Sequence, residues 1–209
     1  MHKLPIAVLI SGNGSNLQAL IDACAEESFP ARIVMVLSNK SNAYGLVRAS
    51  EAGIPTHIIS HKDFPTREAF DRAMDAVLVE SGATLVCMAG FMRLLTAWFV
   101  ERWHNKLINI HPSLLPSFKG LHAQQQALDA GVKVAGCTVH FVRPEMDSGP
   151  IIIQGSVTVH PDDTEDTLAA RILIVEHQCY PQAVRMIAEG ATEASLWASR
   201  SIAENHPPQ

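Results

Sequence analysis

The sequence lacks any apolar run near the length of about 18 residues that a membrane-spanning helix needs. Its N-terminal apolar run covers only residues 6–10, whereas a signal peptide needs about 7–15 apolar residues and a small-residue cleavage site. An excess of basic charge is also missing, because 16 Lys and Arg against 21 Asp and Glu leave a net charge of −5. We therefore expect a cytoplasmic protein without a membrane span and without a nucleic-acid partner.

Cysteine is scarce, and no pair of cysteines forms a CxxC motif. The four are far apart and each has apolar neighbours: Cys24, Cys87, Cys137 and Cys179. This pattern is typical of reduced core thiols rather than of a disulfide or zinc framework. The histidines form no HExxH motif, and residues 58–60 between His57 and His61 resemble the end of a strand rather than a helix. We expect no metal site.

Apolar residues make up 47% of the chain and charged residues 18%, a balance that can bury a core and is too apolar for disorder. The length of 209 residues fits one large domain or two small ones, and no linker, charge block or repeat divides the chain. We predict a single domain over 1–209, with a regular N-terminal half over about 1–103, a looser half over about 104–190 and a C-terminal tail over 191–209.

Short apolar runs alternate with helix-like stretches in the first half. Runs without polar alternation are typical of strands buried on both faces, and they lie at 6–10, 33–37, 57–59 and 85–88. The stretches between them predict helices over 15–27, 43–52 and 66–80. This order requires right-handed crossovers, so the sequence predicts an α/β fold: one doubly wound, mostly parallel open sheet with helices on both faces.

The second half predicts antiparallel additions to this sheet, with strands at 107–110, 137–142 and 151–159. A helix is expected over 121–130, and a long one begins at about Thr164, where Glu165 and Asp166 complement the helix dipole. Pro181 is expected to interrupt this long helix, whose tail runs to Gly190.

A glycine-rich turn, Ser11–Asn16, follows the first strand, where open α/β sheets bind ligands. Its glycines allow close backbone approach, and free N–H groups at a helix start attract a phosphate. Leu17 occupies the third glycine position of a dinucleotide fingerprint, no Gly-Lys-Ser/Thr follows, and residues 38–40 lack a ribose-binding acid. A phosphate monoester is therefore favoured. The alternative is an ordinary tight turn with Ser15 or Asn16 as helix cap.

Asn109 and His111 share one face of a strand, about 6.6 Å apart, and Pro112 ends that strand at the ligand side of the sheet. An amide donor and an imidazole suit the oxyanion of an acyl-transfer intermediate. The alternative is a capped strand end with a buried Asn. Asp147 opens a tight polar loop, 147–150, and could orient the histidine or simply form the turn. Spacing alone does not connect it to His111.

Three segments then identify a resemblance: Ser11–Leu17, Asn109–Pro116 and Asp147–Pro150, in this order. With them the chain closely resembles the phosphoribosylglycinamide formyltransferase family of the formyltransferase superfamily, from about Ile6 to Gly190. Residues 120–122, 126–128, 176–177 and 180–181 narrow the likeness to this family. The resemblance implies a Rossmann-like formyltransferase fold and a metal-free reaction of purine biosynthesis and one-carbon metabolism. In that reaction the formyl group of 10-formyltetrahydrofolate, a tetrahydrofolate co-substrate, passes to the amine of 5-phosphoribosylglycinamide through a tetrahedral intermediate.

The resemblance also implies the roles of the catalytic trio Asn109, His111 and Asp147. Asn109 would donate its amide N–H to the oxyanion, and His111 as imidazolium would stabilise that oxyanion and supply the proton. Asp147 would pair with the histidine and order a water that relays the proton from the amine to the folate nitrogen.

For the phosphoribosylglycinamide substrate, the resemblance implies a phosphate site at Gly14, Ser15 and Asn16 in the N-terminal half, and ribose hydroxyls bound by Glu176. The residue pattern adds that Glu176 lies beside an apolar stripe formed by Leu168, Ile172, Val175 and Cys179. An acid beside a buried stripe needs a partner. The alternative is a solvent-facing glutamate at the edge of the stripe.

Folate binding is expected chiefly in the half over 104–190, and the resemblance implies contacts that also include residues before it: Arg67, Met92, Arg93, Leu94, Leu95, Asn109, Arg143, Pro144, Glu145, Met146 and Asp147. Apolar side chains suit a pteridine ring, and arginines suit the acidic tail of the folate. The stretch 143–146 departs most from the family pattern. Without the resemblance, 92–95 would be interpreted as a helix start that packs on the core.

Four rival interpretations remain. An enzyme that hydrolyses 10-formyltetrahydrofolate would carry an N-terminal regulatory domain, for which the early glycine turn leaves no room. A methionyl-tRNA formyltransferase would carry a C-terminal RNA-binding domain and would be a more basic chain. A phosphate-binding module without catalysis conflicts with the intact trio, and a dinucleotide-dependent reductase conflicts with Leu17. The sequence leaves open whether the protein is a monomer or a homodimer.

Overall fold

The computed structural model describes residues 3–196, and it contains one mixed sheet in the order β3-β2-β1-β4-β5-β6-β7. The strands are β1 (Leu4–Ile10), β2 (Ala31–Ser38), β3 (Thr56–Ile58), β4 (Leu85–Met88), β5 (Leu107–His111), β6 (Val134–Phe141) and β7 (Ile151–Thr158). Neighbouring strands from β3 to β5 are parallel, whereas β6 pairs antiparallel with β5 and β7 antiparallel with β6. The predicted mostly parallel sheet with antiparallel additions is confirmed.

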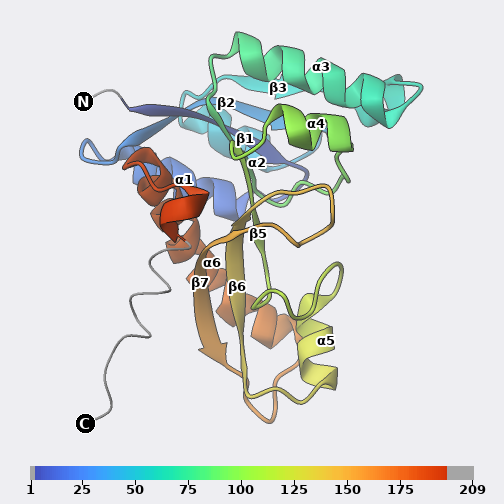
Figure 1. The fold of residues 1–209 in the computed structure, drawn as a ribbon, viewed down its shortest axis with the longest axis vertical. Coiled ribbons are helices and arrows are strands. Elements are labelled where there is room, and N and C mark those ends of the chain that lie inside the picture. The colour runs from blue at the N-terminus through green and yellow to red at the C-terminus, as the bar shows by residue number, and fades with distance from the viewer. Residues whose placement is uncertain (1–2, 197–209) are drawn as a thin grey trace.

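Helices cover both faces of this sheet (Figure 1). They are α1 (Ser15–Ala25), α2 (Gly45–Glu51), α3 (Arg67–Glu80), α4 (Ala97–Arg102), α5 (Ala123–Asp129) and α6 (Glu165–Ala188), with a 3₁₀ turn at His61–Asp63. Side chains of β1 alternate between two cores: Ile6, Val8 and Ile10 pack on the side of α1 and α6, whereas Ala7 and Leu9 pack on the side of α3 and α4. A strand buried on both faces explains the unbroken apolar run in the sequence.

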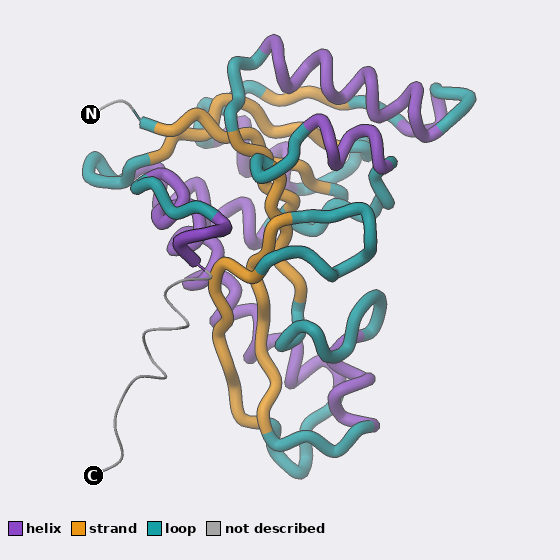
Figure 2. The backbone as a smooth tube through the Cα atoms, viewed as in Figure 1, coloured by secondary structure: helices purple, strands orange, loops and turns teal. Residues whose placement is uncertain are grey.

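The two antiparallel strands extend the molecule beyond its parallel part. Figure 2 shows β6 and β7 as a long hairpin, with the loop between residues 141 and 151 returning toward the parallel strands. Helix α6 packs against both strands of the hairpin and against α1, so it joins the two halves of the chain. The division into functional halves at about residue 103 stays a prediction.

The predicted break at Pro181 is wrong, because α6 continues through it to Ala188. A proline inside a helix loses one backbone hydrogen bond and costs about 3 kcal/mol. Here the flanking side chains Cys179, Tyr180, Ala183 and Val184 are all buried, and the Tyr180 hydroxyl donates to the Met88 carbonyl at 2.8 Å. Tertiary packing on both sides of the proline therefore outweighs its local cost.

Other differences are smaller. Strand β3 is an exposed edge strand rather than one buried on both faces, because only β2 pairs with it. Helix α5 begins at Ala123 rather than at residue 121, and Leu121 is 77% exposed. All four cysteines are free, with Cys24 half-buried and the others buried. Of the predicted tail, residues 197–209 lie outside the described part, and within residues 3–196 no helix has the length and apolar character to cross a membrane.

Candidate active site

The carboxyl ends of three adjacent parallel strands carry most of the predicted site residues. Strands β1, β4 and β5 are neighbours in the sheet, and they are followed by the glycine turn, by the segment 91–96 and by the loop after His111. The Ser11 hydroxyl, at the end of β1, accepts the Met92 N–H at 2.8 Å and donates to the Asn39 amide oxygen at 2.6 Å. This bond network ties the turn to the segment 91–96.

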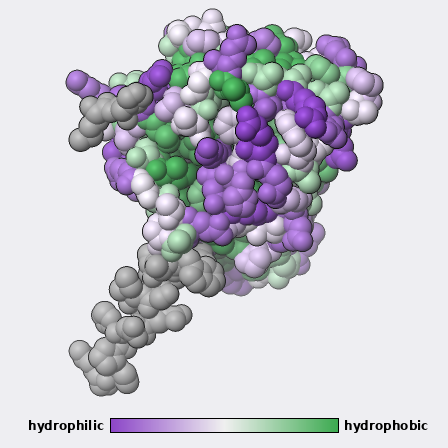
Figure 3. Space-filling view, turned by 45° about the horizontal axis from the view of Figure 1, so that its top comes forward, coloured by the Kyte–Doolittle hydropathy of each residue, from purple (hydrophilic) through white to green (hydrophobic). Residues whose placement is uncertain are grey.

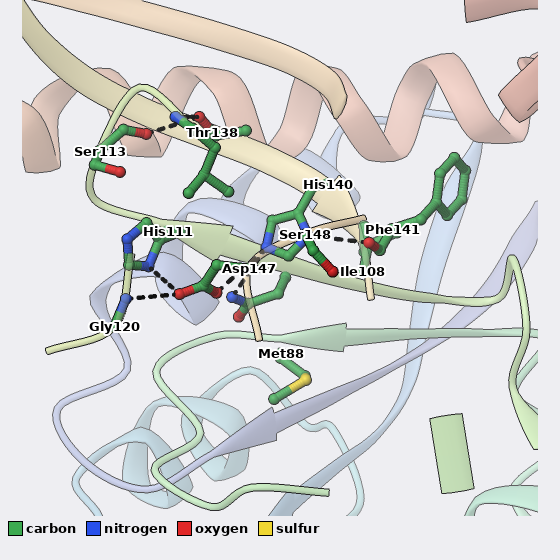
Figure 4. A network of polar contacts seen from close by, with 12 residues as sticks. Met88, Ile108, His111, Ser113, Gly120, Thr138, His140, Phe141, Asp147 and Ser148 are labelled. Carbon is green, nitrogen blue, oxygen red and sulfur yellow. Dashed lines mark hydrogen bonds and ion pairs between the residues drawn. The ribbon is translucent and has the colours of Figure 1, made fainter. Parts of the chain in front are cut away.

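Asp147 approaches the Asn109–His111 strand because β5 and β6 are antiparallel. Their register puts Asn109 opposite His140, and the loop between β6 and β7 then folds back over this pair. Figure 4 shows the Asp147 carboxylate between His111 and His140. Its Oδ2 lies 3.5 Å from His111 Nδ1 and its Oδ1 lies 3.8 Å from His140 Nε2. The structure thus brings together three side chains that spacing could not connect.

The segment after β5 completes the surroundings of His111. His111 Nε2 donates to the Phe118 carbonyl at 2.9 Å, and the Gly120 N–H donates to Asp147 Oδ2 at 2.9 Å. Phe118 and Gly120 both have positive φ angles, which curl the segment over the histidine. Each ring nitrogen of the buried imidazole therefore faces an oxygen acceptor.

His140 is a neutral neighbour of this group that the sequence analysis missed. Burial lowers its pKa, although the Phe141 carbonyl and the Asp147 carboxylate oppose that effect. Its Nδ1 donates to the Phe141 carbonyl at 3.0 Å, so in the neutral ring Nε2 is an acceptor, 3.5 Å from the Asn109 amide nitrogen. One Asn109 N–H is therefore directed at His140, and the second remains available to another acceptor.

The glycine turn presents uncapped N–H groups at the start of α1. Gly14 is the N-cap residue, with φ of 74°, and no side chain caps the helix, so the alternative of Ser15 or Asn16 as cap is wrong. A Cβ on Gly14 would lie 2.7 Å from Gly45 Cα, so the close contact with α2 requires glycine. No acid stands in the first turn. Such a helix start favours an anion.

Arg48 adds positive charge beside this turn. Its guanidinium donates to the Asn13 carbonyl at 2.9 Å and to the Asn13 side-chain oxygen at 3.3 Å. Arg48 and Ser15 line a cavity of about 370 Å³ together with His177. Burial, and then the Arg48 charge, lowers the pKa of His177, whose buried Nε2 has no hydrogen-bond partner in the described part of the chain.

Glu176 is buried, so the alternative of a solvent-facing glutamate is wrong. Its Oε2 accepts the Asn16 amide N–H at 2.7 Å, which joins α6 to the start of α1. Burial raises the pKa of Glu176, while the Asn16 hydrogen bond and the nearby His111 lower it. The Asn16 side-chain oxygen is itself buried without a partner among the described residues. This corner can therefore accept ligand hydrogen bonds.

A second cavity, of about 110 Å³, is lined in part by Asn109. Its lining includes most of the residues predicted to bind the folate: Arg93, Leu94, Leu95, Asn109, Arg143, Pro144, Met146 and Asp147. The segment 92–95 is a loop with Met92 and Leu94 exposed, so the alternative of a helix start is wrong, and α4 begins only at Ala97. The lining is mainly apolar, and its polar members include Asn109, His140 and Asp147.

Three predicted folate residues do not line this cavity: Arg67, Met92 and Glu145. Arg67 is exposed at the first position of α3, and Met92 is exposed next to Arg93, which does line the cavity. Figure 3 shows the face turned toward the viewer, where hydrophilic side chains gather near the centre and apolar ones border them.

Within residues 3–196 no three His, Cys, Asp or Glu side chains are grouped to hold a metal ion, and a metal-free reaction stays a prediction.

The sequence analysis missed three residues near the candidate site, which differ in whether the sequence could have revealed them. His140 alternates with buried apolar residues of β6, so its shared face with Thr138 was a signal of period two. His177 directly follows Glu176, but adjacent residues of a helix point in different directions. Only the packing of α6 shows that His177 lines the same cavity as Ser15. Arg48 left no signal, because its contact with Asn13 depends on how α2 packs beside the turn.

Comparisons with known proteins agree with this geometry. The formyl transferase family model matches residues 4–184. The phosphoribosylglycinamide formyltransferase of Escherichia coli is 44% identical over 98% of this chain and 96% of its own length. A trifunctional purine biosynthetic protein, adenosine-3 of Homo sapiens, is 51% identical over 91% of this chain, which spans only 19% of that protein.

Solved structures give the same relationship. The glycinamide ribonucleotide transformylase 1 of Symbiobacterium toebii has 50% identity and a TM-score of 0.88 over 90% of this chain and 89% of its own. The phosphoribosylglycinamide formyltransferase of Brucella melitensis has 47% identity and a TM-score of 0.86 over 91% of this chain and 98% of its own. With a full-length relative, a family match over nearly the whole chain and the same fold, the chain belongs to the formyl transferase family.

Proposed function

We propose that this protein transfers the formyl group of 10-formyltetrahydrofolate to the amine of 5-phosphoribosylglycinamide, a step of purine biosynthesis. The observation that carries the proposal is the convergence of Asn109, His111 and Asp147 between two candidate binding regions. On one side lies the anion-favouring glycine turn with Glu176, and on the other lies the apolar cavity lined by Leu94. The names of the full-length relatives support the substrate pair.

The geometry of the trio supports the following chemistry. The neutral amine attacks the formyl carbon, a C–N bond forms, and the carbonyl oxygen becomes an oxyanion. The free Asn109 N–H and the His111 imidazolium stabilise this oxyanion. Asp147 holds the cationic histidine and orients a water that carries a proton from the attacking amine to the folate nitrogen. The bond to that nitrogen then breaks, and formylated product and tetrahydrofolate leave.

The phosphate and ribose of the acceptor would be bound at the start of α1. The uncapped N–H groups after Gly14, with the Ser15 hydroxyl and the nearby Arg48, suit a phosphate dianion. Glu176 would accept the ribose hydroxyls, and the unpartnered oxygen of Asn16 supports a ligand there. This arrangement keeps the amine on the His111 side of the site.

The folate would lie along the segment 92–95 and the loop 143–147. Apolar Leu94, Leu95 and Met146 suit the pteridine ring, and backbone groups of the loop suit its polar edge. Exposed Arg67 and half-buried Arg93 would meet the acidic tail. Cytoplasmic location, the absence of a nucleic-acid partner and a monomeric or homodimeric state belong to the same proposal.

The test is a formyl-transfer assay with purified protein and 10-formyltetrahydrofolate, run with and without phosphoribosylglycinamide. We expect tetrahydrofolate release only when the acceptor is present, together with formylated product. Release at an equal rate without acceptor would make the protein a hydrolase that uses the same trio. No turnover in either case would contradict catalysis, and the protein would then be a binding module.

A further inference from the structure

We propose that Glu193, in the segment after α6, is a positioning residue for the folate side of the site. It holds Arg143, and through Arg143 it holds the loop 142–150 that carries Asp147. The inference rests on the proposed function and deepens it, because it adds the C-terminal segment to the folate-binding machinery. It concerns the stretch 143–146, which departs most from the family pattern.

The guanidinium of Arg143 is directed at two segments outside the proposed folate cavity. Its Nη2 donates to Glu193 Oε2 at 2.7 Å and to the side-chain oxygen of Asn105 at 2.6 Å, and its Nη1 donates to the Val142 carbonyl at 3.0 Å. The Arg143 side chain is 17% exposed. Charge-assisted bonds of this length, at a largely buried guanidinium, fix the direction in which the loop leaves β6.

The loop is held closely at its base and borders a cavity on its other side. The Phe141 N–H donates to the Pro150 carbonyl at 2.9 Å, and a Cβ on Gly149 would lie only 1.7 Å from the Phe141 oxygen. Behind the loop, however, a cavity of about 760 Å³ lies between Gly149 on one side and Glu193 on the other, within the described residues. On this side the loop is therefore held by the Arg143–Glu193 bridge rather than by packed apolar side chains.

A loop held in this way has a simple energetic consequence. If the bridge is lost, the loop populates orientations in which Asp147 and Met146 no longer border the folate cavity. The apparent folate affinity then falls by the fraction of molecules in the competent state. Bound folate selects that state again, so the loss is seen in the folate KM and much less in the KM of the acceptor.

The experiment compares Glu193→Gln, Arg143→Gln and the double variant in the full chain. We expect each single variant to raise the folate KM by about three- to fivefold, the scale of one partly exposed charged pair. The acceptor KM should stay within about 1.5-fold, since Gly14, Ser15 and Asn16 line neither the cavity beside Glu193 nor the proposed folate cavity. The double variant should equal the weaker-binding single variant, because both substitutions break one bridge.

Arg102→Gln is the matched control, since it removes the ion pair that exposed Arg102 on α4 makes with the largely buried Asp75 on α3. It should leave both KM values unchanged. Titration calorimetry with 10-formyltetrahydrofolate alone gives a second readout that needs no turnover. An unchanged folate Kd in Glu193→Gln, or equal rises in both KM values with a lower Tm, would overturn the inference. If the wild-type protein bound folate without transferring the formyl group, the proposed function would be overturned. The role of the Arg143–Glu193 bridge in folate binding would not.

Discussion

At the scale of single residues, the proposed chemistry depends on groups that differ in charge although they lie within a few ångströms. His111 has acceptors at both nitrogens, whereas neighbouring His140 is kept neutral by burial, which lowers its pKa. The two imidazoles therefore have different surroundings, and neutral His140 offers its Nε2 as an acceptor to Asn109. Environment rather than residue type makes this difference.

The first prediction concerns the oxyanion donors. Asn109→Ala and His111→Ala should each lower kcat by about a hundred- to a thousandfold, because each removes one stabilising donor from the transition state. Steady-state rates of formyl transfer measure this. His104→Ala, which changes an exposed histidine outside the site, is the control and should keep the wild-type rate. Near-normal turnover of either site variant would contradict the assignment.

The second prediction concerns Glu176. Glu176→Ala should raise the KM of phosphoribosylglycinamide by about ten- to a hundredfold, since hydrogen bonds to a charged group are lost. The folate KM should change by less than about twofold, because Glu176 contacts Asn16 and not the folate cavity. Separate titrations of the two substrates provide the measurement. Equal rises in both KM values would instead indicate a general disturbance of α6.

At the scale of elements, the site is set by how turns and loops pack against their neighbours. The glycine turn lies so close to α2 that Gly14 has no room for a side chain. The same turn forms the candidate anion site. The loop 142–150 has a similar dependence, because Gly149 lies against Phe141 and Asp147 itself has a φ of 50°.

Gly14→Ala is the prediction at this scale, compared with Gly53→Ala. Both glycines have positive φ, so each substitution should lower the free energy of unfolding by about 1 kcal/mol from backbone strain. Only at Gly14 would the added Cβ also meet backbone, at 2.7 Å from Gly45 Cα. We expect a larger loss there and a rise of about tenfold or more in the acceptor KM. Denaturant unfolding and kinetics test this, and identical behaviour of the two variants would refute it.

At the scale of the whole molecule, α6 links the hairpin, the glycine turn and the parallel sheet. It packs on α1, β6 and β7 and carries buried Glu176 into the site. An ionised acid in this position costs stability, because burial favours its neutral form. The stability of the whole chain should therefore depend on the ionisation of this one group.

Glu176→Gln should raise the Tm at pH 7.5 and give no gain at pH 4.5. Since burial raises the pKa of Glu176 above its ordinary value of 4.5, its contribution to stability is fully present at low pH. That contribution is lost as pH rises through the folded-state pKa. Glutamine is neutral throughout and still accepts the Asn16 N–H. Calorimetric scans at both pH values decide the point, and an equal gain at both would show that ionisation is not the cause.

The sequence by itself determined the order of elements and the nature of the chemistry. Unbroken apolar runs predicted the parallel strands, and the two-residue period put Asn109 and His111 on one face. Local backbone geometry is enough for both, since each depends on neighbours a few positions away. The motif resemblance then supplied the family and the substrates, including residues whose roles remain predictions.

Only the tertiary structure decided which distant residues meet. Asp147 reaches His111 through the antiparallel register of β5 and β6, and that register also introduces His140. Arg48, Glu176 and the Arg143–Glu193 bridge depend on helix packing and on loop closure. Even the continuation of α6 through Pro181 is a result of packing. Such contacts join residues far apart in the chain, so local preferences carry no information about them.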